Sequence, residues 1–113
     1  MGVALINGKE GNLYFTQFWK SVGFSTPIYG ADILQTLMDE SAGAWHLDHL
    51  DTILNKGLPR KIRGVNNSYC YYGSWKSLFC WHKEDLDLSA INFLHQGQPK
   101  FWYCIQPDHG GIL

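Results

Sequence analysis

The chain has 113 residues, a length that accommodates at most one domain of common size. A hydrophobic content of 45% and a charged content of 17% are typical of globular proteins and exclude a disordered chain. The net charge of -1 gives no reason to expect direct binding to nucleic acid or to an anionic membrane.

The first half of the chain predicts little regular structure. Residues 1–23 are predicted to be irregular, because glycines stand at positions 2, 8, 11 and 23. Pro27–Asp32 is predicted to be an extended piece that ends in a turn. Only Ala44–Asn55 has apolar residues at helical spacing, and Gly57-x-Pro59 is expected to end that helix.

The second half predicts consecutive short strands separated by turn-like sequences. These strands are expected at Tyr69–Tyr72, Lys76–His82, Leu88–Leu94 and Lys100–Ile105. Short strands joined by tight turns favour an antiparallel barrel or jelly roll. The predicted fold class is therefore mainly β with a flanking helix.

A histidine and a carboxylate two residues apart, His82 and Glu84, stand at the end of the second predicted strand. Residues i and i+2 of a strand point to one face, so both side chains could bind one metal ion. Such a pair supplies part of a 2-His-1-carboxylate iron site. The same spacing occurs at His46-x-Asp48 and His49-x-Asp51. On the predicted helix those residues are roughly 200° apart, so they are interpreted as solvated polar positions.

The cysteines and the apolar runs predict a soluble, intracellular protein. Cys70, Cys80 and Cys104 lie in apolar runs without a C-x-x-C motif, which is typical of free thiols in a reducing compartment. No apolar run approaches the ~20 residues that span a membrane. The patch Val3–Ile6 is too short for a signal peptide.

A longer set of motifs occurs in a fixed order. From residue 64 the chain reads Gly64-Val65-Asn66, Tyr69-x-Tyr71-Tyr72-Gly73-x-Trp75-Lys76 and Trp81-His82-x-Glu84-Asp85-x-Asp87-Leu88. It continues with Ile91-Asn92-Phe93-Leu94-His95-x-Gly97-x-Pro99-Lys100-x-Trp102-Tyr103 and Pro107-x-His109-Gly110. Upstream it has Phe18-Trp19-Lys20 and Pro27–Asp32. Together these motifs resemble the jumonji C (JmjC) histone lysine demethylases, above all the lysine-specific demethylase 4 group.

The resemblance implies a partial double-stranded β-helix (jelly roll) that binds Fe(II) and the co-substrate 2-oxoglutarate. It implies oxidative removal of methyl groups from lysine on a histone tail, with release of formaldehyde, and a nuclear location. His82 and Glu84 match two iron ligands. The residues that match co-substrate positions are Tyr29, Phe79, Asn92, Lys100 and Trp102. Those that match the methyl-lysine pocket or the histone tail site are Gly64, Tyr69, Tyr71 and Asp32.

The resemblance also predicts how the chain is divided. Residues 18–113 are expected to form the N-terminal part of a JmjC domain, with the remaining iron ligand and the last strands beyond Leu113. His95 and His109 match positions that are not ligands in the family. Residues 1–17 are expected to be an irregular, misjoined segment, because Leu13–Gln17 resembles a family segment that normally lies further upstream. We therefore expect the fragment alone to be inactive.

Two alternatives stay open at this point. The chain could be a catalytically inactive module that binds methyl-lysine or a chromatin partner, or a JmjC hydroxylase acting on protein side chains or RNA. By residue chemistry alone, Lys100 is better interpreted as a solvated lysine after the turn at Pro99, since lysines are rarely buried. Only the family spacing favours a co-substrate role. Neither the preferred histone lysine nor the oligomeric state can be predicted.

Overall fold

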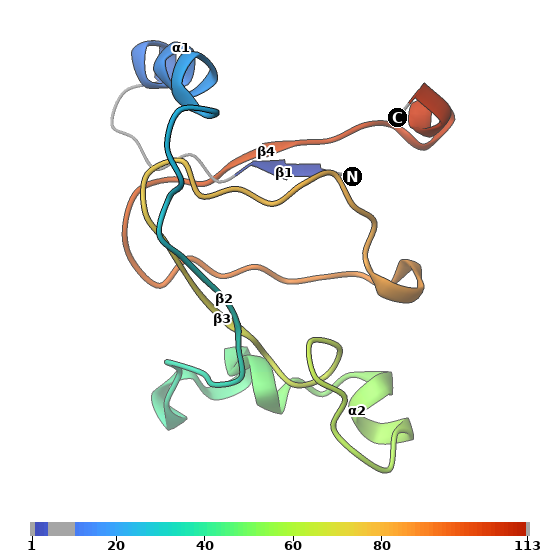
Figure 1. Ribbon diagram of the computed structural model, residues 1–113. Helices are drawn as coiled ribbons and strands as arrows, with labels where there is room; N and C mark the ends of the chain where they lie inside the picture. The colour runs from blue at the N-terminus through green and yellow to red at the C-terminus, as the bar shows by residue number, and fades with distance from the viewer. Residues whose placement is uncertain (1, 5–10, 113) are drawn as a thin grey trace. The chain divides into compact units, whose positions relative to one another are not determined.

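The computed structural model describes residues 2–4 and 11–112. The chain forms two units, one made of Met1–Tyr29 and Gly73–Leu113 and the other of Gly30–Tyr72. Figure 1 shows the course of the chain, which enters the second unit after Tyr29 and returns to the first at Gly73. In the described ranges no helix has the length and apolar character needed to cross a membrane.

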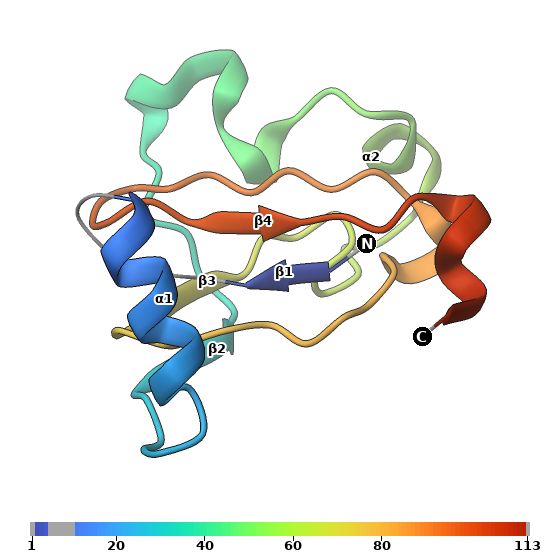
Figure 2. The ribbon, with the colours of Figure 1, turned by 90° about the horizontal axis from the view of Figure 1, so that it is seen from above.

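The first unit pairs its two chain ends. Strand β1 (Gly2–Ala4) runs antiparallel to β4 (Phe101–Tyr103), with Gly2 opposite Tyr103 and Ala4 opposite Phe101 (Figure 2). Helix α1 (Gly11–Ser21) packs against β4 through Phe15. The ring centroid of Phe15 lies 6.5 Å from that of Phe101 and 6.0 Å from that of Tyr103.

The expectation of irregular structure in residues 1–23 is wrong for β1 and α1. Phe15, Phe18 and Trp19 are spaced i, i+3 and i+4, which places them along one side of a helix. Phe18 is completely buried and packs edge-on against Trp19 and Trp75. The burial of Phe18 within this aromatic stripe stabilises the helix. Residues 5–10 lie outside the described part.

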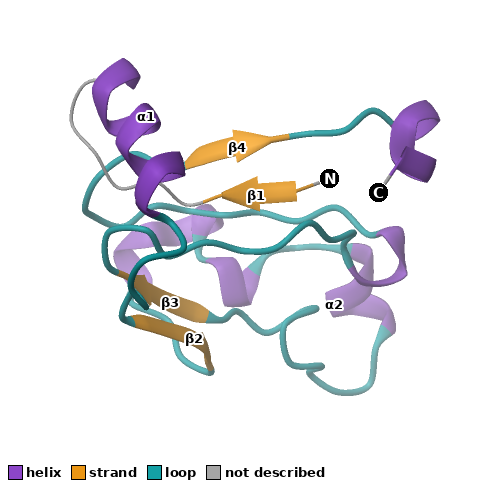
Figure 3. Cartoon of the chain, turned by 45° about the horizontal axis from the view of Figure 1, so that its top comes forward, coloured by secondary structure: helices purple, strands orange, loops and turns teal. Residues whose placement is uncertain are grey.

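Strands β2 (Tyr29–Ile33) and β3 (Cys70–Gly73) form a two-stranded sheet, shown side by side in Figure 3. All but the first residue of β2 and the last residue of β3 belong to the second unit. Strand β2 confirms the extended piece at Pro27–Asp32, and β3 confirms the strand at Tyr69–Tyr72 within one residue. Asp32 has a φ of 55°, a left-handed conformation that Asp adopts more readily than most residues.

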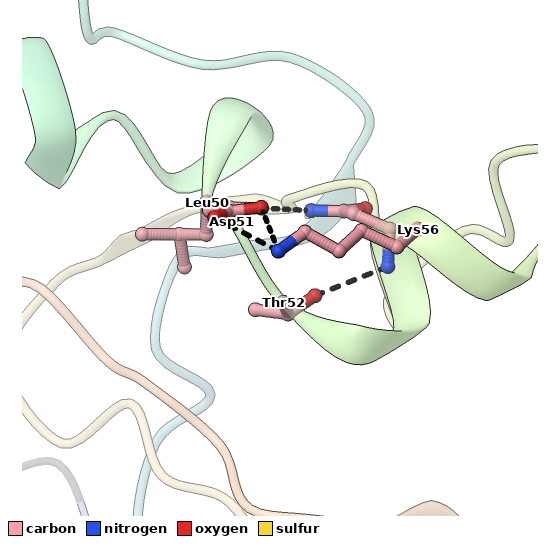
Figure 4. Close-up of polar contacts among 5 residues, drawn as sticks. Leu50, Asp51, Thr52 and Lys56 are labelled. Carbon is pink, nitrogen blue, oxygen red and sulfur yellow. Dashed lines mark hydrogen bonds and ion pairs between the residues drawn. The ribbon is translucent and has the colours of Figure 1, made fainter.

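The single helix predicted at Ala44–Asn55 is wrong, because several short helices replace it. They are the 3₁₀ helices Glu40–Trp45 and Leu47–His49 and the α-helix α2 (Ile53–Gly57). Gly43 interrupts the first of them with a φ of 54°. Thr52 begins α2, since its hydroxyl accepts a hydrogen bond from Asn55 N at 3.1 Å (Figure 4).

Helix α2 ends at Gly57, as the Gly57-x-Pro59 sequence predicts. Leu58 precedes the proline and has an extended backbone, which is the conformation that a following proline favours. The side chain of Lys56 pairs with Asp51 at 2.9 Å across the start of this short helix (Figure 4). Local capping contacts therefore favour several short helices, where the leucine spacing predicts one continuous helix.

The strands predicted at Lys76–His82 and Leu88–Leu94 are also wrong, since the structure has no ladder strand in either range. Residues 100–105 contain a strand only at β4. Two further 3₁₀ helices lie in this half of the chain, at Asp85–Asp87 and Pro107–Ile112. A strand requires a hydrogen-bonded neighbour, which an apolar run cannot supply by itself. The described sheets have two strands each and do not confirm a jelly roll.

Among the side chains that the structure describes, Phe18 is the one fully buried apolar residue. The other buried side chains are polar: His46, Lys76 and Ser77. All three cysteines are free, as predicted, although Cys80 and Cys104 are exposed rather than part of a core. Polar contacts therefore carry much of the order in these units.

Candidate functional site

The sequence-predicted site residues fall into two groups according to their unit. The first unit holds the predicted iron and co-substrate residues: Tyr29, Phe79, His82, Glu84, Asn92, Lys100 and Trp102. The second unit holds the predicted substrate residues: Asp32, Gly64, Tyr69 and Tyr71. Each group is taken by itself below.

The imidazole of His82 is oriented by the backbone of Cys80. Its Nδ1 lies 2.7 Å from the carbonyl oxygen of Cys80, which can only accept, so Nδ1 carries the proton and donates. This fixes the tautomer that leaves Nε2 with a lone pair, the form in which histidine binds a metal. Glu84 is exposed and immediately precedes the 3₁₀ helix Asp85–Asp87.

The prediction that His82 and Glu84 lie on a strand is wrong. His82 and Glu84 lie in coil, so the alternation of a strand does not place their side chains on one face. The residues that the structure describes contain no group of three or more His, Cys, Asp or Glu side chains arranged to hold a metal. The histidine tautomer fits a metal ligand, and the full ligand set is not formed by these residues.

An aromatic row connects three of the predicted residues in the first unit. The ring centroids of Tyr29 and Phe79 are 5.6 Å apart in an edge-to-face arrangement. Those of Phe79 and His82 are 5.8 Å apart. Such ring contacts stabilise by about 0.5–1.5 kcal/mol beyond the area they bury. The structure therefore brings together a predicted co-substrate residue and a predicted iron ligand through Phe79.

Two other predicted co-substrate residues are in direct contact. The ammonium of Lys100 donates to the amide oxygen of Asn92 at 2.5 Å. Partial burial lowers the pKa of Lys100 below its usual 10.5. Trp102 lies two residues further on, in β4, with its side chain 51% exposed. A partly desolvated ammonium with a neutral partner is suited to bind an anion.

The predicted substrate residues form a connected cluster in the second unit. The hydroxyl of Tyr71 donates to Asp32 Oδ1 at 2.7 Å. The rings of Tyr69 and Tyr71 meet edge to face at 6.3 Å. Gly64, with a φ of 72°, lies directly against the ring of Tyr69. This arrangement offers aromatic rings and a carboxylate, the groups that bind alkylated ammonium ions.

The other two pairs with this spacing, His46-x-Asp48 and His49-x-Asp51, are not uniformly solvated, contrary to expectation. His46 is 6% exposed and stacks on His49 at 4.0 Å between ring centroids. Asp48 is half-buried and accepts a hydrogen bond from Ser68 N at 2.6 Å. Only His49 and Asp51 are exposed. The folded segment consists of short turns, so the helical wheel did not describe which side chains are covered.

Sequence reasoning missed the polar residues that hold the backbone before Tyr29. Ser77 is 1% exposed, and its hydroxyl donates to the carbonyl oxygen of Ile28 at 3.0 Å. Lys76 is buried among oxygens of Ser21 and Ser25. The available signal was a lysine and a serine inside an apolar run, because buried polar groups require partners.

Comparison with known proteins gives a match to a protein family. A family model described as "JmjC domain, hydroxylase" matches residues 69–113. Those residues are therefore similar to the JmjC family, which agrees with the resemblance and fits a cupin-like domain. No solved structure gives a significant match to the chain.

The similar curated proteins narrow the group. Lysine-specific demethylase 4B of Mus musculus is 47% identical, "Probable lysine-specific demethylase 4F" of Homo sapiens 50%, and lysine-specific demethylase 4D of Rattus norvegicus 46%. Each comparison extends over 100 residues, or 86% of this chain. The chain spans only 9%, 16% and 20% of the length of these relatives, respectively. The chain is thus related to the lysine-specific demethylase 4 proteins over most of its own length.

Proposed function

We propose that this chain carries part of the catalytic domain of an Fe(II)- and 2-oxoglutarate-dependent histone lysine demethylase. The proposal includes residues 18–113 as the N-terminal part of that domain, a jelly-roll fold for the complete domain, a methylated histone tail as substrate, and a nuclear location. Kinship with demethylases supports the reaction class. The names of these relatives do not assign activity to this chain.

The observation that carries the proposal is the contact between Lys100 and Asn92. The ammonium is partly desolvated, and its partner is a neutral amide oxygen at 2.5 Å. A dicarboxylate co-substrate would place one carboxylate against Lys100 and offer a further acceptor to the amide N–H₂ of Asn92. A cation that loses hydration is stabilised by pairing with an anion, so a carboxylate is a suitable partner for the ammonium of Lys100.

The chain's own residues have separate roles in the proposed reaction. His82 Nε2 and the carboxylate of Glu84 would hold Fe(II), with Nδ1 of His82 fixed on the Cys80 carbonyl. Tyr29 and Phe79 would shield one side of the co-substrate from water. Bound Fe(II) supplies oxidation by O₂, with 2-oxoglutarate converted to succinate and CO₂ while the N-methyl group leaves as formaldehyde.

The first test is co-substrate binding by the 113-residue chain. Isothermal titration with 2-oxoglutarate, under anaerobic conditions with Fe(II), should detect binding that Lys100→Ala abolishes. Lys83→Ala is the matched control, because Lys83 is an exposed lysine that pairs with Asp87 at 3.6 Å. Equal binding by the Lys100 variant and the wild type would contradict the proposal.

The second test is turnover. Formaldehyde release from a trimethyl-lysine histone peptide should depend on 2-oxoglutarate in a chain that completes the iron site. Products heavier by one oxygen, without loss of methyl groups, would instead indicate the hydroxylase alternative. We expect the isolated chain to show no turnover. For the chain itself, the proposal is therefore tested by 2-oxoglutarate binding.

A methyl-lysine binding module is the second candidate. It is favoured by the connected cluster of Asp32, Tyr71, Tyr69 and Gly64, whose contacts all lie within the second unit. Binding of a methylated histone peptide without any response to Fe(II) or 2-oxoglutarate would support this alternative. Tyr71→Ala should then remove binding, while Tyr72→Ala should preserve it, since Tyr72 is exposed and on the opposite side of β3.

A further inference from the structure

The backbone of Ile28 is held by two serines of the turn that follows β3. Its carbonyl oxygen accepts from Ser74 N at 2.9 Å and from the Ser77 hydroxyl at 3.0 Å. Its N–H donates to the Ser74 hydroxyl at 2.9 Å. Both polar backbone groups of Ile28 are therefore satisfied by Ser74 and Ser77, within the first unit.

Side-chain packing does not explain the position of Ile28, because its side chain is 72% exposed. Ser77, by contrast, is 1% exposed and is packed closely beneath the turn. A Cβ atom at Gly73 would lie 2.9 Å from Cβ of Ser77, so only glycine permits this approach. Hydrogen bonding through the backbone is what fixes the chain at Ile28.

Lys76 anchors the preceding segment to the same turn. Its ammonium donates to the carbonyl oxygens of Ser21 at 3.0 Å and Ser25 at 3.2 Å, and also to the Ser25 hydroxyl. Lys76 has a φ of 72°, a left-handed conformation that is strained for a residue other than glycine. Such strain persists only where surrounding contacts determine the geometry, as these oxygen contacts do.

The Ile28 carbonyl belongs to the peptide plane that connects Ile28 to Tyr29, so fixing that oxygen sets the direction in which Tyr29 leaves the turn. Tyr29 then packs edge-on against Phe79, which in turn contacts His82. We propose, on the basis of the function proposed above, that Ser74 and Ser77 are positioning residues that aim Tyr29 at 2-oxoglutarate. They act through the backbone of Ile28 and do not touch the co-substrate.

Single substitutions separate this role from folding. Ser77→Ala removes one of two donors to the Ile28 carbonyl, and Ser74→Ala removes the acceptor of the Ile28 N–H. Each leaves the remaining contacts in place. One ordinary hydrogen bond corresponds to roughly a three- to tenfold change in an equilibrium constant. We therefore expect each variant to weaken 2-oxoglutarate binding by about that factor.

The experiment uses the whole chain with tyrosine labelled at its ring Cε carbons. The Tyr29 signal is assigned from Tyr29→Phe, and the Tyr103 signal from Tyr103→Phe. Tyr103 reports on folding, because it packs on Trp19 and Phe15 of the same unit. Ser89→Ala is the matched control, since Ser89 is exposed and lies in coil. Titration with 2-oxoglutarate follows on every variant.

The expected result is a shifted or broadened Tyr29 signal in Ser77→Ala and Ser74→Ala, with the Tyr103 signal and Ser89→Ala unchanged. An unchanged Tyr29 signal in both serine variants would overturn the positioning role, whatever their affinity. Loss of the Tyr103 signal in Ser77→Ala would mean that this variant does not fold. The positioning role is then tested by Ser74→Ala alone, which does not alter the packing of a buried side chain. Absence of 2-oxoglutarate binding by the wild type would reject the proposed function. The Tyr29 signals of the wild type and the serine variants would still show whether the serines position the ring.

Discussion

The aromatic ring of Tyr69 lies directly against the backbone of Gly64. A Cβ atom at position 64 would be 2.6 Å from Cε2 of Tyr69, well inside van der Waals contact. Gly64 also has a φ of 72°, a backbone conformation that is unfavourable for residues other than glycine. This position thus combines a close approach with a left-handed backbone, next to the Tyr69–Tyr71 ring pair.

Replacing Gly64 by alanine should destabilise the second unit and displace the ring of Tyr69. We expect a loss of about 1–3 kcal/mol in the free energy of unfolding, from the strained backbone and the forced movement of the ring. Urea denaturation measures the change. Gly57→Ala is the matched control, because nothing lies within 4 Å of its added Cβ, and it should be neutral or slightly stabilising. Equal stability of the two variants would disprove this account of Gly64.

The elements that sequence predicted well are those whose signals are local. Tyr69–Tyr72 carries strong strand formers and forms β3 within one residue, and Gly57-x-Pro59 ends α2 where expected. Residues 76–82 have an equally apolar pattern and form no ladder, because pairing depends on a neighbour that the pattern does not specify. The aromatic stripe of α1 was present in the sequence but was outweighed by nearby glycines.

The candidate site was predicted by family resemblance rather than by chemistry. Residue chemistry alone favoured a solvated Lys100, whereas its ammonium contacts Asn92 in the structure. The strand argument for His82 and Glu84 was wrong, and their assignment as iron ligands stays a prediction from the resemblance. Neither pattern nor resemblance indicated that Ser77 holds Ile28, because that contact joins residues 49 positions apart. Only folding brings such partners together.

Replacing Lys76 by methionine should destabilise the C-terminal end of α1. Methionine keeps the length of the side chain but leaves the oxygens of Ser21 and Ser25 without their ammonium donor. Losing the hydrogen bonds of the buried Lys76 ammonium costs about 1–3 kcal/mol, and the left-handed backbone at position 76 would remain. Thermal unfolding followed by circular dichroism measures the loss.

The matched control for that change is Lys83→Met. Lys83 is exposed, and its ion pair with Asp87 spans 3.6 Å at the surface. Exposed pairs contribute about 0–1 kcal/mol, so the control should stay close to the wild type. A Lys76 variant as stable as the Lys83 variant would show that the buried ammonium contributes nothing to stability.

Asp48 should make the second unit sensitive to acid. Burial alone would raise the pKa of Asp48, but hydrogen bonds from Ser68 and Asn67 outweigh it and hold the pKa below its usual 3.8. A carboxyl with a lowered pKa stabilises the fold above its unfolded pKa and loses that contribution as the pH falls through the folded value. The free energy of unfolding should therefore decrease below about pH 4.

Asp48→Asn removes this ionisation while keeping an acceptor for Ser68 N. Its unfolding free energy, measured between pH 2 and 6, should depend less on pH than that of the wild type, by no more than about 1 kcal/mol. Asp39 contributes a remaining slope, because the side-chain hydrogen bond from Ser41 lowers its pKa as well. Identical pH profiles for the wild type and Asp48→Asn would contradict the role of Asp48.

Lys100 should make 2-oxoglutarate binding depend on alkaline pH. Burial lowers its pKa below the usual 10.5, and a bound carboxylate favours the charged form and raises the pKa again. Binding then requires proton uptake once the free ammonium has begun to deprotonate. Affinity for 2-oxoglutarate should consequently fall as the pH rises through the pKa of free Lys100, and remain constant at lower pH.

The variant that tests this charge effect is Lys100→Arg. Arginine stays protonated throughout the range, so its affinity should be independent of pH there, even though its altered shape weakens binding by about tenfold at neutral pH. Titration calorimetry from pH 7 to 10 on the wild type and on Lys100→Arg measures the difference. If Lys100→Arg shows the same alkaline loss as the parent, the titrating group is not Lys100, and the anion site has to be assigned elsewhere.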